Sequence, residues 1–248
     1  MKPLADFHVA LTFLTRLGRA RLVSPADISG SMSMYPLVGA LIGLILALAS
    51  FAPLSPAVLA WILTGLNLYV TRGLHWDGWA DLWDGWGSGT VGERFWSIVK
   101  DSRTGAFGVM GLVLGLGLQS ALFERALAKG AWTALIWAPV FGRFCCLVLA
   151  RWGRGLARPG LGQNAAHGAT SRALFGAGAT TLLAGCLVPW PQAAATVVLA
   201  VFPLVALIRL GRRQNGLNGD FLGAAIIAGE LCALLSLCLV SDSVQAIF

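Results

Sequence analysis

Long apolar runs restrict the fold of this chain more than any other feature. Seven mostly apolar segments, each close to the roughly 20 residues that a bilayer-spanning helix needs, follow one another along the sequence. Only 12% of the 248 residues are charged, which is about half the fraction found in soluble domains. The sequence therefore predicts an all-α, polytopic integral membrane helical bundle. We expect about seven transmembrane helices, near residues 35–52, 56–72, 105–123, 131–150, 173–190, 193–210 and 221–240.

The N-terminal apolar run, Phe7 to Leu14, is too short to span a bilayer. It has no small-residue cleavage site after it, so we predict a short interfacial or re-entrant helix rather than a signal peptide. No linker and no strong internal repeat divides the chain. A single membrane-embedded domain over residues 1–248 is the expectation.

The loop charges predict the orientation of the bundle. On the expected spans, fifteen Lys and Arg residues collect on one side, and only Arg125 and Lys129 lie on the other. Positive loops face the cytoplasm, so we expect the loop around residues 73–103 on the cytoplasmic side of a bacterial inner membrane. No basic tract is interleaved with exposed aromatic residues, which argues against nucleic-acid binding.

The segment GLHWDGWADLWDG (73–85) carries the most chemistry. Asp77, Asp81 and Asp84 are spaced by four and three residues, which places them within about 60° on a helix. Four tryptophans fall on nearly the opposite side. Clustered carboxylate oxygens suit Mg²⁺, with Mn²⁺ as a substitute, so these three aspartates are the predicted metal ligands. A solvated acidic helix is the alternative, although it would have no use for four tryptophans.

Further polar residues extend this candidate site. Arginines from several loops could hold phosphate oxygens as bidentate donors, and the candidates are Arg103, Arg143, Arg158, Arg212 and Arg213. Glu230 falls inside the last span, where a carboxylate is either functional or the structural partner of a buried arginine. His75 is either a ligand or base, or a local hydrogen-bonding residue. The sequence contains no Walker-type phosphate loop, HExxH motif or nucleophilic serine elbow.

Several motifs resemble the cobalamin synthase family in order along the chain. They are HVALTFLTRL (8–17), YPLVGALIG (35–43), GLHWDGWADLWDG (73–85), KDSRTGAFGVMGLVL (100–114), ARPGLG (157–162) and NGDFLGAAIIAGEL (218–231). The acidic motif and the KDSR block are the specific ones. Tryptophans at 76, 79, 83 and 86, and Arg72, stand where smaller residues are usual in that family.

The resemblance implies the last assembly step of the cobalamin nucleotide loop. Adenosylcobinamide-GDP and α-ribazole, or its 5′-phosphate, would give adenosylcobalamin, or its phosphate, and GMP in a Mg²⁺-dependent reaction. By position in the motifs, Asp84, Asp101 and His75 are the expected catalytic residues. Arg103, Arg143 and Arg158 are the expected phosphate-binding residues, and Asp220 and Glu230 join them in substrate binding. Either Asp101 or Asp220 is also expected to complete the metal site. Membrane lipid is a further expected partner, together with a second copy of the chain or other corrinoid-pathway enzymes.

Two other functions fit parts of the pattern. A CDP-alcohol phosphotransferase acting on lipid would also use clustered aspartates at a membrane, but its motif has an arginine where this chain has Leu82, and it has a later aspartate pair that is missing here. A metal or proton transporter would place carboxylates deep in several spans. Here most of the carboxylates fall in the expected cytoplasmic loops, which favours an enzyme.

Overall fold

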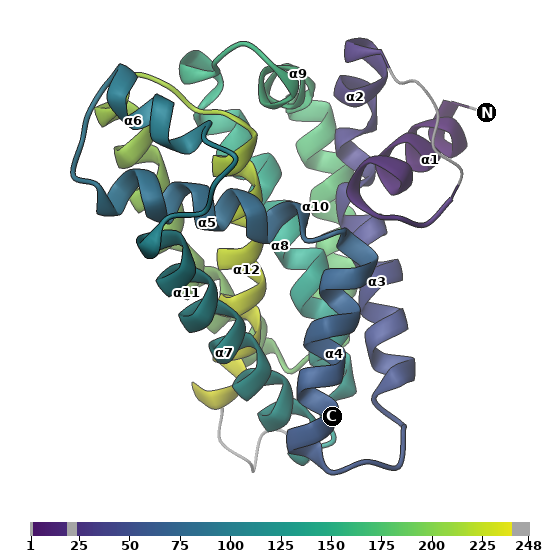
Figure 1. Ribbon diagram of the computed structural model, residues 1–248. Coiled ribbons are helices and arrows are strands. Elements are labelled where there is room, and N and C mark those ends of the chain that lie inside the picture. The colour runs from purple at the N-terminus through teal and green to yellow at the C-terminus, as the bar shows by residue number, and fades with distance from the viewer. Residues whose placement is uncertain (1, 19–23, 240–248) are drawn as a thin grey trace.

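A computed structural model describes residues 2–18 and 24–239 of the chain. These residues form a helical bundle, and an isolated bridge between Ala157 and Leu217 is the one strand-like pairing among them (Figure 1). The helices are α1 (Lys2–Leu14), α2 (Pro25–Ser31), η1 (Met32–Met34), α3 (Tyr35–Ala49), α4 (Pro56–Thr71), α5 (Leu74–Gly87), α6 (Glu93–Val99), α7 (Ala106–Ala128), α8 (Trp132–Trp152), η2 (Arg154–Leu156), α9 (Leu161–Gly168), α10 (Ser171–Gly185), α11 (Trp190–Arg213) and α12 (Gly219–Leu239).

The helical, polytopic architecture is confirmed, and the expected count of seven spans is only approximate. Within the described residues, five helices are long and apolar enough to cross a membrane, or six if α4 and α5 are counted as one broken span. They are 25–49, where α2, η1 and α3 follow directly, and α7, α8, α11 and α12. The expected span at 173–190 corresponds to α10, which has only 15 residues. The short N-terminal helix is present as α1, with 13 residues.

Helix α8 forms the centre of the bundle, between α3 and α12. Small residues allow these helices to approach closely, as is usual where helices pack within a bilayer. A Cβ atom on Gly39 of α3 would lie 2.4 Å from the carbonyl oxygen of Pro139 in α8. On the other side, a Cβ atom on Gly142 would lie 2.5 Å from the carbonyl oxygen of Ile226 in α12. Larger residues at either glycine would separate the central helices.

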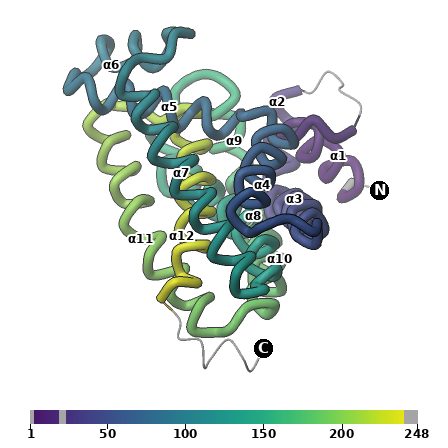
Figure 2. Tube along the Cα trace, turned by 60° about the horizontal axis from the view of Figure 1, so that its bottom comes forward, coloured from purple at the N-terminus to yellow at the C-terminus, as the bar shows by residue number. Residues whose placement is uncertain are grey.

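The short helices gather at one end of the bundle, which we call the polar end. Helices α1, α2, α5, α6 and α9 lie there, while the long helices extend away from it (Figures 1 and 2). The loop before α6 is tied to the turn after α11, because the side chain of Gln214 accepts from the Gly92 amide at 3.0 Å and Trp96 Nε1 donates to the Gln214 carbonyl at 2.9 Å. Helix α7 starts at this end and finishes at the other. Arg125 and Lys129 therefore lie at the opposite end from the last turn of α11.

Candidate active site

Helix α5 lies across the polar end because the chain bends sharply after α4. The two helices meet at 95°, and the bend is made by Arg72 and Gly73, which both adopt left-handed backbone conformations, with φ of 58° and 66°. Beyond the bend α5 packs closely on α12. A Cβ atom on Gly78 would lie 2.7 Å from the Cα of Asp220. The acidic motif is thus on a helix that runs across the bundle rather than along it.

The predicted aromatic face of α5 is present and packs against α7. The four indole rings form a series, with centroids 6.0, 6.0 and 5.7 Å apart from Trp76 to Trp86. Two of them fill space left by glycines of α7: a Cβ atom on Gly111 would lie 2.4 Å from the ring of Trp83, and one on Gly115 would lie 2.5 Å from that of Trp76. The aromatic series fixes the rotation of α5 about its own axis.

The carboxylates of this helix form a cluster with Asp220, which lies in the first turn of α12. Asp77 is exposed and Asp81 is half-buried. Burial first, and then the negative charges of three neighbouring carboxylates, raise the pKa of Asp81 to about 7. The neighbours are Asp220, Asp77 and Asp84. Three of these four aspartates were predicted to lie together from helical spacing, and the fourth arrives through the packing of α12 on α5.

Asp84 differs from the other members of the cluster because both its carboxylate oxygens have backbone partners. Oδ2 accepts from the amide of Gly105 at 2.7 Å, and Oδ1 accepts from that of Gly108 at 2.8 Å. These amides belong to the start of α7, where N–H groups have no partner inside the helix. Asp84 therefore anchors the N-terminus of α7 to α5. The structure gives it a positioning contact in place of the open metal-ligand position expected for it.

A cavity of about 200 Å³ opens beside the carboxylates. Asp77, Asp220 and His75 line it, together with residues of α1 and α9. His75 is buried with no hydrogen-bond partner on Nε2. Burial, followed by the positive charge of Arg143, lowers the pKa of His75 well below its usual value, so the imidazole is neutral at pH 7. Among residues 2–18 and 24–239, no three His, Cys, Asp or Glu side chains are placed to hold one metal ion.

Asp101 and Arg103 line a second cleft of about 340 Å³, which also contains Asp84. Arg103 Nε and Nη2 donate to the two carboxylate oxygens of Asp101 at 3.0 and 2.7 Å. These hydrogen bonds lower the pKa of Asp101 to about 2. The Arg103 side chain is 87% exposed. It therefore lies within reach of an incoming anion that could replace its partner.

Arg143 and Glu230 do not join the aspartate cluster. Arg143 Nη1 donates to Glu230 Oε1 at 2.6 Å, and the two side chains are 0% and 3% exposed. Glu230 also accepts from the amides of Asn67 and Gln119, at 3.3 and 3.4 Å. Of the two roles left open for Glu230, the structure supports the partner of a buried arginine. Arg143 is fully enclosed in the bundle, in contrast to the phosphate-binding position expected for it.

Arg158, the third arginine expected to bind phosphate, already has partners within the protein. Its guanidinium lies 4.4 Å from the ring centroid of Trp96 and donates to Glu93 at 3.4 Å.

The sequence analysis did not single out Asn218, which donates to Asp220 Oδ2 at 2.6 Å and so orients that carboxylate. Its position two residues before Asp220, in the NGD motif, was the available signal.

Comparison with known proteins connects this geometry to a family. The family model for cobalamin-5-phosphate synthase matches residues 6–238. The chain belongs to this family. The matched region contains every residue of the aspartate cluster, so the resemblance inferred from the motifs is confirmed.

Curated members of the family are similar over most of their length. An adenosylcobinamide-GDP ribazoletransferase of Nitratidesulfovibrio vulgaris strain Miyazaki F is 47% identical over 227 residues, 90% of each chain. One from the Hildenborough strain is 42% identical over 92% of this chain and 95% of its own. The protein of that name from Syntrophobacter fumaroxidans is 36% identical over 89% and 92%. No solved structure matches the chain.

Proposed function

We propose that this chain is a membrane transferase that joins adenosylcobinamide-GDP to α-ribazole or α-ribazole 5′-phosphate. A ribazole hydroxyl oxygen forms a bond to the cobinamide-side phosphorus, the phosphoanhydride bond breaks, and GMP leaves. The products are adenosylcobalamin, or its 5′-phosphate, and GMP. The family match over residues 6–238 supports this activity. The main structural support for this activity is that Asp77, Asp81 and Asp220 lie close together beside a cavity at the polar end.

The carboxylate cluster fits a divalent cation by its chemistry. Carboxylate oxygens are the ligands that Mg²⁺ and Mn²⁺ prefer, and their mutual repulsion, which raises the pKa of Asp81, would be relieved by a cation. Mg²⁺ commonly uses one or two protein carboxylates and completes its shell with water and substrate phosphates. A preformed set of three protein ligands is therefore not required. When bound, the cation supplies charge neutralisation at the phosphates.

The residues of the chain then have separate roles. One or two carboxylates of the cluster of Asp77, Asp81 and Asp220 would hold the cation, with water and substrate phosphates completing its shell. A carboxylate of this cluster accepts the proton of the attacking hydroxyl. Asp84 keeps α7, and with it the cleft of Asp101 and Arg103, at a fixed position beside the cluster. The exposed Arg103 exchanges Asp101 for a phosphate of the donor, because a planar guanidinium binds both anions bidentately.

We place the protein in the bacterial cytoplasmic membrane, with the polar end in the cytoplasm. The charge asymmetry of the loops supports this orientation. The lipid-enzyme and transporter alternatives are less well supported. The buried carboxylate of Glu230, which a transporter would use along its pathway, is paired with Arg143 instead.

Incubation of the purified protein with adenosylcobinamide-GDP, α-ribazole and Mg²⁺ tests the proposal. We expect GMP and a cobalamin product, and loss of both in Asp77→Asn and Asp81→Asn. Glu124→Gln is the matched control, since it neutralises an exposed carboxylate on α7 away from the cluster. Full activity of both aspartate variants at saturating Mg²⁺ would refute the role of the cluster. Absence of product with the unaltered protein would refute the reaction.

A further inference from the structure

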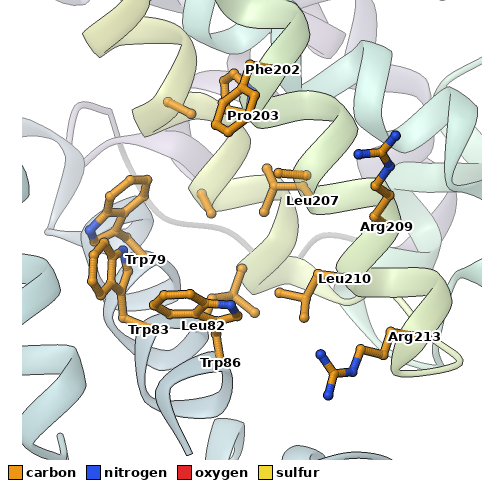
Figure 3. Close-up of a pocket in the computed structure, with 13 residues that line it drawn as sticks. Trp79, Leu82, Trp83, Trp86, Phe202, Pro203, Leu207, Arg209, Leu210 and Arg213 are labelled. Carbon is orange, nitrogen blue, oxygen red and sulfur yellow. The ribbon is translucent and has the colours of Figure 1, made fainter. Parts of the chain in front are cut away.

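An apolar cleft lies on the tryptophan side of α5, away from the carboxylates. It has a volume of about 530 Å³ and separates α5 from α11. Figure 3 shows the indole side chains of Trp79, Trp83 and Trp86 on one wall and the side chains of α11, including Phe202, on the other. The side chains of Trp86 and Phe202 are 59% and 81% exposed. Large apolar side chains therefore face an opening that the described part of the chain does not fill.

One edge of this cleft is strongly basic. Arg209 and Arg213 line it and are both exposed. They are four residues apart on α11, so their side chains lie on the same face of the helix. No acidic side chain of the described residues pairs with either of them. Two adjacent guanidinium groups beside an apolar cleft complement a ligand that has a phosphate at one end and hydrocarbon at the other.

The position of the cleft in the bundle agrees with this ligand chemistry. Arg213 is the last residue of α11, which is one of the five long apolar helices. The two arginines therefore lie where the span ends, at the depth of lipid headgroups, and Phe202 lies two to three turns deeper along the same helix. Tryptophan is enriched at this level of a membrane because its ring is apolar and its N–H is polar. Helix α11 is also the least enclosed of the long helices, with 17% of its most apolar window buried.

From these observations we propose that the cleft is a binding site for one anionic phospholipid. Arg209 and Arg213 hold the headgroup phosphate, and an acyl chain lies between the tryptophans of α5 and Phe202 of α11. The lipid thus completes the wall behind the helix whose other face carries Asp77 and Asp81. Lipid binding itself does not depend on the proposed transferase reaction; only the support that the lipid gives to catalysis rests on it.

Binding is tested with the full-length protein in phosphatidylcholine vesicles that contain phosphatidylglycerol with brominated acyl chains. Bromine quenches tryptophan fluorescence at contact. The chain has 10 tryptophans, so Trp83→Phe should remove only the part of the quenching that Trp83 contributes. Arg209→Gln with Arg213→Gln should weaken binding by about 25-fold, roughly fivefold for each surface arginine. Brominated phosphatidylcholine should quench Trp83 much less at the same concentration.

Arg212→Gln is the matched control. It removes the same charge from the same turn of α11, but Arg212 does not line the cleft. If it weakens binding as much as Arg213→Gln does, the attraction belongs to the surface in general and the proposed site is refuted. Equal quenching by the two brominated lipids would refute it as well, and so would quenching that appears only when a second copy associates.

A second variant separates binding from folding. Ala206 lines the cleft and is exposed, so Ala206→Phe should block the acyl chain and remove the quenching of Trp83 while the thermal midpoint stays unchanged. In parallel, GMP release should fall in vesicles that lack anionic lipid. A lipid site without any effect on GMP release would leave binding intact and refute only its catalytic role. Absent GMP release in all vesicles, with normal quenching, would refute the proposed function instead.

Discussion

The buried pair of Arg143 and Glu230 makes a quantitative prediction about stability. In Arg143→Met, the carboxylate of Glu230 keeps only the two amide donors at 3.3 and 3.4 Å and loses the guanidinium at 2.6 Å. Removing one partner of a buried ion pair costs about 3–5 kcal/mol, because the other charge stays behind without compensation. For a chain of this size, each kcal/mol shifts the thermal midpoint by about 2–4 °C. We therefore expect a fall of about 6–20 °C.

The double variant separates loss of the pair from loss of packing. Replacing both partners of a buried pair by apolar residues is often close to neutral. Arg143→Met with Glu230→Met should therefore recover most of the lost stability. A double-mutant cycle should then give a coupling free energy of about 3 kcal/mol or more.

Thermal unfolding of the purified protein in detergent, followed together with GMP release, provides the assay. Arg125→Met, an exposed arginine at the far end of α7, is the control and should change stability by less than about 0.5 kcal/mol. An unchanged midpoint in Arg143→Met, combined with a raised KM for the GDP-activated donor, would refute this reasoning. Arg143 would then be a substrate-binding residue that the described conformation encloses.

Four further predictions concern the polar end. Asp84→Ala should lose roughly 1–3 kcal/mol of unfolding free energy for the buried Gly108 N–H group left without an acceptor, and less for the exposed Gly105 N–H group, and unfolding with denaturant measures the loss. Gly111→Leu should destabilise the protein because its Cβ would lie 2.4 Å from the ring of Trp83, and adding Trp83→Ala should restore part of the loss. The raised pKa of Asp81 means that the folded state favours the protonated form, so stability falls as the pH rises from about 4 towards 7. Asp81→Asn should accordingly raise the thermal midpoint at pH 8 without Mg²⁺, and this gain should shrink towards pH 4. A cysteine at Ser88, in a chain whose five own cysteines are replaced by serine, should react with an impermeant reagent only from the cytoplasmic face; labelling from outside intact cells would contradict the proposed orientation.

The parts of the fold that depend on local sequence could be predicted. Apolar runs identified the long helices because the bilayer requires a fixed length of apolar chain. The spacing of Asp77, Asp81 and Asp84 placed them on one face of α5, and the structure has them as neighbours. The helix length at α10 was overestimated because its apolar composition continues past Gly185, where the helix ends.

The partners of individual side chains depend on how distant segments meet, and most could not be read from the sequence. Asp84 anchors α7 only because α7 starts beside α5, and the spacing of residues along the chain does not indicate that these two segments meet. Arg143 and Glu230 are 87 residues apart, yet a charge inside each of two spans was a usable signal that they pair. The assignment of Arg143 to phosphate overlooked that signal. The contact between Asp220 and the aspartates of α5 depends on the packing of α5 across α12, which the spacing of residues along the chain does not indicate.

The bend between α4 and α5 determines from where the cluster of aspartates is approached. If α5 continued in the direction of α4, its carboxylates would lie along the bundle instead of at its end. Bulky polar molecules would then need a passage between the helices to reach them. Turned by 95°, the same residues lie across the end of the bundle. The two water-soluble reactants of the proposed reaction would then meet at this end without crossing the bilayer, and both products would leave on the side from which the reactants came.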